Sequence, residues 1–143
     1  MFRTILRLGV VVTFGIGGSL ALADTAGPAA SLQRLRPPES IKCSRDRLTA
    51  FQGNVTAYSR AKQDMTLRVR TDEDTTENFS LKWAADEQPD TWMLMRGQPF
   101  KAGDWKLIES APGKLFEGTR AIVWVCADGP KPVIDWRPKE LGS

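Results

Sequence analysis

The chain has 143 residues, of which 41% are hydrophobic and 26% charged, and this fits one domain with a single core. Its formal net charge is +3, but two arginines lie within the first seven residues, so the remainder is too nearly neutral to indicate a nucleic-acid partner. The sequence contains no histidine, which excludes Ser-His-Asp and Cys-His catalysis and the commonest zinc and iron ligand sets.

Residues 1–23 have the composition of a secretory signal peptide. Two arginines precede an apolar run from Leu8 to Leu20, and Ala21 to Ala23 has the small-x-small pattern that a signal peptidase accepts. The run is shorter than the ~20 apolar residues of a membrane helix and contains several glycines. We therefore predict cleavage after Ala23, a periplasmic or secreted bacterial protein, and no membrane span after cleavage.

Residues 24–40 are rich in Ala and Pro and lack a sustained period, so we predict an extended or disordered tether before a single domain at 41–143. Cys43 and Cys126 lie near the start and the end of that domain. Because the leader directs the chain to an oxidising compartment, we predict a disulfide between them, with two buried free thiols as the alternative. In the chain-entropy model, a disulfide that closes a loop of this size stabilises the folded protein by about 4 kcal/mol.

Three successive β-strands are predicted between Gly53 and Trp83. The stretch just before them is ambiguous between helix and strand, and we favour a strand from Phe51. Met65 to Arg70 and Phe79 to Trp83 then alternate apolar and polar residues, which places their apolar side chains on one face of a sheet. That face is the predicted core.

The second half of the domain contains shorter elements. Pro89 to Arg96 is predicted as a short helix, because Pro suits a first helical position and Gly97 suits a C-terminal stop. Strands are predicted at Trp105 to Glu109, at Ala121 to Ala127, and at Val133 to Trp136 near the end of the chain. For Trp136 we predict a closing latch against the domain, with an exposed contact point as the alternative.

Three consecutive strands, a short helix and further strands form the order of an OB-fold, a partly open five-stranded barrel. Over residues of about 51 to 127 the chain resembles small secreted bacterial OB-fold proteins. The resemblance lies in Gly53-x-Val55, the alternating strand from Met65 to Arg70 and the position of the predicted helix before the fourth strand. The predicted fold class is therefore all-β with one short helix, an OB-like, partly open five-stranded barrel with a disulfide between the start and the end of the domain. The resemblance concerns the fold and supplies no function.

The polar face of the three strands is the main candidate for a binding surface. Period two places an aromatic and several cations on it, namely Tyr58, Arg60, Arg68, Arg70 and Lys82. OB-folds commonly bind ligands on this face, and these residue types suit an anionic ligand, an anionic polymer or an acidic patch of a periplasmic protein partner. The alternative is a solvated face that binds nothing.

Trp92, Met93 and Met95 form the second candidate site. Periplasmic copper(I) carriers with a small OB barrel bind the ion with thioethers beside a tryptophan, and this segment resembles them in part. Those carriers also use a histidine, which this chain lacks, so core packing of the methionines is the alternative.

A small carboxylate-based hydrolase is a third hypothesis, because two acids at a suitable separation suffice for that chemistry. The acids of this sequence cluster at turns, however, where solvated surface is their ordinary role. The sequence therefore predicts a non-enzymatic binding module without a cofactor, with copper(I) handling as the leading alternative.

Overall fold

The structure is a computed structural model that describes residues 35–129 and 131–139. The predicted signal peptide, residues 1–23, and most of the predicted tether, residues 24–40, lie outside the described residues. Among the described residues, the first helical or strand element is the 3-10 helix η1 (Arg45–Arg47). No helix within the described ranges combines the length and the apolar character that crossing a membrane requires.

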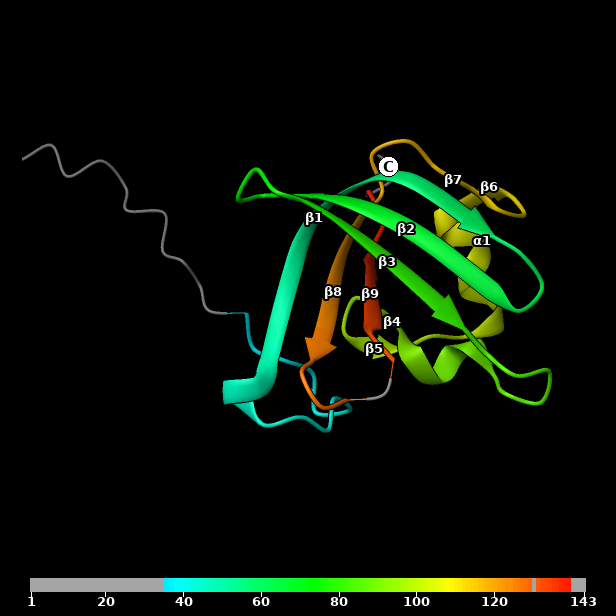
Figure 1. The fold of residues 1–143 in the computed structure, drawn as a ribbon. Coiled ribbons are helices and arrows are strands. Elements are labelled where there is room, and N and C mark those ends of the chain that lie inside the picture. Colours follow the sequence, from blue (N-terminus) through cyan, green and yellow to red (C-terminus); the bar gives the residue numbers. More distant parts are fainter. Residues whose placement is uncertain (1–34, 130, 140–143) are drawn as a thin grey trace, which may run out of the picture. The chain divides into compact units, whose positions relative to one another are not determined.

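The described residues form nine strands in two sheets (Figure 1). The strands of the larger sheet are β1 (Leu48–Arg60), β2 (Asp64–Thr71), β3 (Thr76–Lys82), β4 (Met93–Met95), β5 (Gln98–Pro99), β8 (Arg120–Cys126) and β9 (Val133–Arg137). The smaller sheet is a hairpin of β6 (Glu109–Ala111) and β7 (Lys114–Leu115). The helical elements after β3 are η2 (Pro89–Trp92), η3 (Ala102–Asp104) and α1 (Trp105–Ile108).

The larger sheet has the strand order β3-β2-β1-β8-β9-β4-β5. Its neighbours are antiparallel except β4 and β9, which are parallel, so the sheet is mixed. The predicted β-rich fold with one short helix is confirmed, but the five-stranded barrel is not what forms, because seven strands hydrogen-bond in an open order. The physical reason is β9, which was expected to be a closing segment and instead lies between β8 and β4.

β1 is shared by two strand pairs that overlap at Gly53 and Asn54. Its first half pairs with β8 and its second half pairs with β2, and the strand curves between them (Figure 1). A Cβ atom at position 53 would lie 2.0 Å from the carbonyl oxygen of Arg70, so glycine is required for this close approach of the backbones. A β-bulge between Val55 and Ala57 follows directly.

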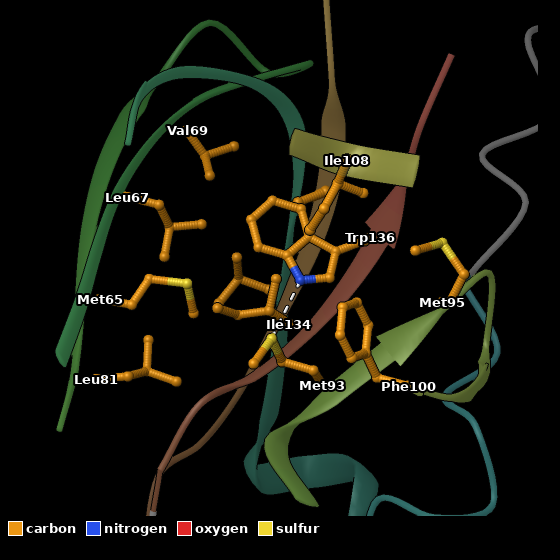
Figure 2. Close-up of a cluster of buried hydrophobic side chains, with 12 residues drawn as sticks. Met65, Leu67, Val69, Leu81, Met93, Met95, Phe100, Ile108, Ile134 and Trp136 are labelled. Atoms are coloured by element: carbon orange, nitrogen blue, oxygen red, sulfur yellow. Dashed lines mark hydrogen bonds between the residues drawn. The ribbon is translucent and has the colours of Figure 1, made fainter. Parts of the chain in front are cut away.

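The hydrophobic core surrounds Trp136, whose side chain has no exposed surface (Figure 2). Apolar side chains of β2 and β3 lie on one side of the indole, Met95 and Phe100 lie on the other, and Met93 lies at the N–H edge of the ring. Four of the residues that the alternating pattern assigned to the core are buried, namely Met65, Leu67, Val69 and Leu81. Phe79 and Trp83, assigned to the same face, are partly buried against it.

Two predicted elements differ from the structure. The predicted helix from Pro89 to Arg96 is helical only as far as Trp92, after which β4 begins. Arg96 and Gly97 form the two-residue turn between β4 and β5, and both have positive φ, as a type I′ hairpin turn requires. The predicted strand at Trp105 to Glu109 is instead α1 followed by β6.

The helical geometry of α1 explains the second difference. Trp105 and Ile108 are three positions apart, so a helix directs both toward the core and leaves Leu107 49% exposed, whereas a strand would have placed Trp105 and Leu107 on one face. The turn before α1 is held by the carboxylate of Asp104, which accepts a hydrogen bond from the backbone N–H of Lys101 at 2.8 Å.

The predicted disulfide between Cys43 and Cys126 is present, with the two Cα atoms 6.0 Å apart. Cys126 is the last residue of β8 and lies opposite Leu48, the first residue of β1. The disulfide therefore joins the segment just before β1 to the end of β8, the strand that pairs with β1. It holds the β1–β8 pair together at this end.

Candidate functional site

The outer face of the molecule is the solvent-facing side of β2, β3 and the part of β1 that follows the bulge. The strand register places Ala57, Arg68 and Asn78 in one row across the three strands, and Thr66 lies opposite Ser80 in the next row. All five side chains are exposed. Because residues two apart on a strand share a face, these rows form one continuous surface.

The outer face contains a hollow of about 320 Å³. Its lining consists of Ala57, Thr66, Leu67, Arg68, Asn78, Phe79 and Ser80. The lining is mixed: Ala57, Leu67 and Phe79 contribute apolar surface, and the polar residues offer two hydroxyls, an amide and a guanidinium that can bind hydrogen-bond acceptors and negative charge.

Arg68 is the only charged residue of that lining, and its side chain is oriented. Its Nε donates a hydrogen bond to Oδ1 of Asn78 at 2.9 Å, from the neighbouring strand. Within residues 35–129 and 131–139, no carboxylate forms an ion pair with Arg68. The terminal nitrogens of its guanidinium therefore remain available for a bidentate contact with an oxyanion.

Arg70 and Lys82 lie on the same outer face, on either side of the hollow along the strands. Arg70 is paired with Asp74 at 3.0 Å, but both side chains are more than half exposed, so the pair contributes little energy and does not hold Arg70 firmly. Lys82 stands opposite Asp64 at the end of β3. The two cations add positive potential to the surroundings of Arg68.

Tyr58 and Arg60 lie on the opposite side of the sheet from Arg68 and Arg70, so the five predicted contact residues do not share one face. The bulge after Val55 inserts one residue into β1, and beyond it Tyr58 stands opposite the buried Leu67. A one-residue insertion exchanges the two faces of a strand, and this is why both side chains point inward.

Arg60 and Tyr58 form a buried cluster with Glu109 at the start of β6. Two nitrogens of Arg60 donate to the two carboxylate oxygens of Glu109 at 2.8 and 2.6 Å, and the hydroxyl of Tyr58 donates to Oε1 at 2.7 Å. The Glu109 side chain is 4% exposed. The Arg60 guanidinium also lies 4.0 Å from the centre of the Trp105 ring, which adds a cation–π contact.

The electrostatics of the buried cluster keep Glu109 ionised. Burial raises the pKa of the Glu109 carboxyl, but the hydrogen bonds from Arg60 and Tyr58 outweigh it and the net pKa lies below its ordinary value. Burial, together with the bond to Glu109, raises the pKa of Tyr58. A carboxylate held in this way is a poor proton donor, and the cluster instead fixes the β6–β7 hairpin to β1.

Met93 and Met95 both lie in the hydrophobic core rather than at the surface. Met93 is 1% exposed and its sulfur accepts a hydrogen bond from the indole N–H of Trp136 at 3.4 Å, whereas Met95 is 9% exposed (Figure 2). Trp92 packs against Trp83 with ring centres 5.7 Å apart, and Lys131 lies over its ring. These contacts are those of the packing alternative for this segment.

The buried acids are distributed singly. Glu109 is bound by Arg60, and the fully buried Asp135 accepts hydrogen bonds from the Gly97 N–H at 2.8 Å and from Arg137 at 2.5 Å. Nowhere in the described ranges do three side chains of His, Cys, Asp or Glu come together as a metal site would require. Both acids therefore have structural partners that account for their burial.

Sequence reasoning identified Arg68, Arg70 and Lys82 for the outer face and missed the role of Glu109. The residues around Glu109 carry no sequence signal for this role, because its partners are about fifty positions away in β1. Comparisons with protein-family models, with curated proteins and with solved structures gave no match for this chain. Its candidate function is therefore argued from the geometry of the outer face.

Proposed function

We propose that this chain is a non-enzymatic binding module, acting outside the cytoplasm, that recognises an anionic partner through its outer face. The observation that carries the proposal is Arg68, an oriented guanidinium at a hollow, with no carboxylate partner among the described residues.

The orientation of Arg68 supports an anchoring role. An arginine loses up to about 2 kcal/mol of side-chain entropy when it is immobilised, and the bond to Asn78 meets part of this cost before the partner arrives. A carboxylate or phosphate can then accept two parallel hydrogen bonds from the guanidinium, the strongest arrangement open to this side chain. The hydroxyls of Thr66 and Ser80 line the same hollow and add neutral partners.

The surrounding charge supports an anion rather than a neutral ligand. Arg70 and Lys82 flank the hollow, and Asp64 is the acid that faces Lys82. Exposed charges of one sign raise the local concentration of an oppositely charged partner. Salt screens this attraction, and at an ionic strength of 0.1 M the screening length is about 10 Å. The disulfide between Cys43 and Cys126 is compatible with an oxidising compartment as the place where binding occurs.

Binding to immobilised polyacrylate, a polymer of carboxylates without peptide groups, tests this proposal, with polyacrylamide as the uncharged reference. Wild type should bind polyacrylate more weakly as salt is raised, and Arg68→Ser should weaken binding at least about tenfold, since a charge-assisted hydrogen bond is worth about 1.5–3 kcal/mol.

Arg45→Ser is the matched control, because Arg45 is also exposed but lies in η1, before β1 begins. It should reduce binding only slightly. Equal losses in Arg68→Ser and Arg45→Ser, or no binding of wild type to polyacrylate, would contradict the proposal.

A further inference from the structure

We infer that the anionic partner is an extended acidic segment of another protein, which adds a strand to the open edge of β3. This inference rests on the proposed function, because it assigns a partner to the same outer face. The inference rests on the backbone groups of β3, whereas the proposed function rests on the side chains that line the hollow.

The sheet leaves one side of β3 open. β3 is the first strand in the order of the larger sheet, so among the strands that the structure describes it has a neighbour only on its β2 side. Figure 1 shows β3 along the margin of the meander, beyond β2. An edge strand of seven residues presents a row of N–H and C=O groups that another extended chain can bind.

The register decides which residues face the open edge. In an antiparallel pair, hydrogen-bonded and non-hydrogen-bonded positions alternate. Trp83 N–H donates to the Gln63 carbonyl at 3.1 Å, and Thr71 N–H donates to the Thr75 carbonyl at 2.9 Å, so both ends of the β2–β3 ladder are hydrogen-bonded positions. Counting inward from these ends in steps of two, Leu81, Phe79 and Glu77 also bond to β2. The residues between them direct their N–H and C=O groups to the open edge, namely Thr76, Asn78, Ser80 and Lys82.

The same four residues carry their side chains on the outer face. All four are exposed, whereas Phe79 is partly buried and Leu81 is buried on the inner face. An added strand would therefore extend the row of Ala57, Arg68 and Asn78 by one more side chain. Strands are about 4.8 Å apart, so its backbone would lie about 10 Å from that of Arg68, within reach of a Glu side chain meeting the guanidinium across the short Asn78.

Charge selects an acidic partner over a second copy of this chain. On the outer face Asp74 pairs with Arg70 and Asp64 faces Lys82, whereas Arg68 has no carboxylate partner among the described residues, so an acidic residue placed beside Asn78 would meet the positive charge of Arg68. The edge of a second copy offers Thr, Asn, Ser and Lys on its outer side and brings no carboxylate to Arg68. The geometry therefore favours an extended acidic segment of a different protein.

Amide hydrogen exchange of the purified protein with a capped seven-residue peptide of alternating Glu and Val tests the inference directly. In saturating peptide, the amides of Asn78, Ser80 and Lys82 should exchange at least about tenfold more slowly. The amides of Phe79 and Leu81 already bond to β2, so their exchange should change little. A peptide in which Lys replaces Glu should protect none of them.

Two further changes separate strand addition from contact by side chains alone. N-methylation of the alternate peptide residues that face β3 should abolish protection, because it removes their hydrogen bonds and leaves their charge. Ser80→Pro removes an edge donor without breaking the ladder to β2, since Pro is tolerated on the open side of an edge strand. Ser80→Ala loses the same hydroxyl as Ser80→Pro but keeps the backbone N–H, so Ser80→Pro should weaken peptide binding at least about tenfold more than Ser80→Ala does.

The outcomes distinguish this inference from the proposed function. Binding of polyacrylate through Arg68 without protection of the β3 amides overturns strand addition and leaves the anion-binding function standing. Failure of both probes overturns both. Protection of these amides without peptide, increasing with protein concentration, would identify a second copy as the occupant and would also overturn the inference.

Discussion

Arg60 and Glu109 form a bidentate ion pair that is largely removed from water. The Arg60 side chain is 24% exposed and that of Glu109 is 4% exposed, so water screens the pair far less than it screens the exposed pair of Arg70 and Asp74. Removing one partner of a buried pair leaves the other charge without compensation, which is more costly than the loss of the attraction itself.

Arg60→Ala should therefore destabilise the protein at neutral pH by about 3 kcal/mol, the lower part of the range for buried pairs because Arg60 keeps some exposure. The loss should depend on pH. In wild type the pKa of folded Glu109 is lowered, so its contribution to stability is present above the unfolded pKa of about 4.3 and lost as pH falls through the folded value. In Arg60→Ala, the hydrogen bonds from Arg60 no longer offset the rise in the Glu109 pKa that burial causes. The difference in unfolding free energy between wild type and Arg60→Ala should therefore grow as pH rises.

Urea unfolding of both proteins between acid and neutral pH measures this difference. Arg70→Ala is the control, because its ion pair with Asp74 is exposed and should cost less than about 1 kcal/mol at any pH. An Arg60→Ala protein no less stable than Arg70→Ala at neutral pH would show that the buried cluster contributes no net stability.

At the scale of the element, β1 depends on one residue for its path. The missing Cβ at Gly53 lets the Arg70 backbone approach to a distance that no other residue permits. We expect Gly53→Ala to destabilise the fold by about 3 kcal/mol, the upper end of the range for overpacking, because the obstructing atoms belong to the backbone of a paired strand.

Gly103→Ala is the matched control for Gly53→Ala. A Cβ at Gly103 would meet no atom within 4 Å, so this change should be neutral or stabilise the protein by up to about 1 kcal/mol. Thermal unfolding of the two variants beside wild type measures both effects. Similar unfolding temperatures for the two variants would mean that β1 and β2 separate at little cost.

β1 also marks the limit of what alternation could predict. The alternation of apolar and polar residues correctly assigned the two faces of β2 and β3, because the pairing of these strands contains no irregularity. It therefore placed Arg68, Arg70 and Lys82 correctly on the outer face. The bulge after Val55 adds a single residue without a distinctive sequence, and beyond it every assignment in β1 is inverted, including that of Tyr58. The candidate site was thus predictable on two of its three strands.

At the scale of the molecule, the strand order was less predictable than the strands. The sequence located β8 and β9 to within one residue at each end, yet nothing local indicates that β9 pairs in parallel with β4, about forty positions earlier. Burial of Trp136 at the centre of the core decides this pairing, and such long-range packing has no signature in a local pattern.

Loss of the disulfide should lower stability by about 4 kcal/mol, because Cys43 and Cys126 are 83 positions apart and their bond restricts the unfolded chain over that length. Urea unfolding of Cys43→Ser/Cys126→Ser, compared with oxidised and reduced wild type, measures the loss. The variant and the reduced protein should agree with each other. An unchanged unfolding midpoint after complete reduction would contradict the expected contribution.

The position of that disulfide also determines how the protein bears mechanical load. Tension applied to the chain before Cys43 and after Cys126 passes through the sulfur–sulfur bond, so β1 to β8 carry none of it. Of the described strands, only β9 lies in the loaded path, and it would peel away from β8 and β4 first. A reductant would release the shielded segment, which could then lengthen by roughly 290 Å at about 3.5 Å per residue.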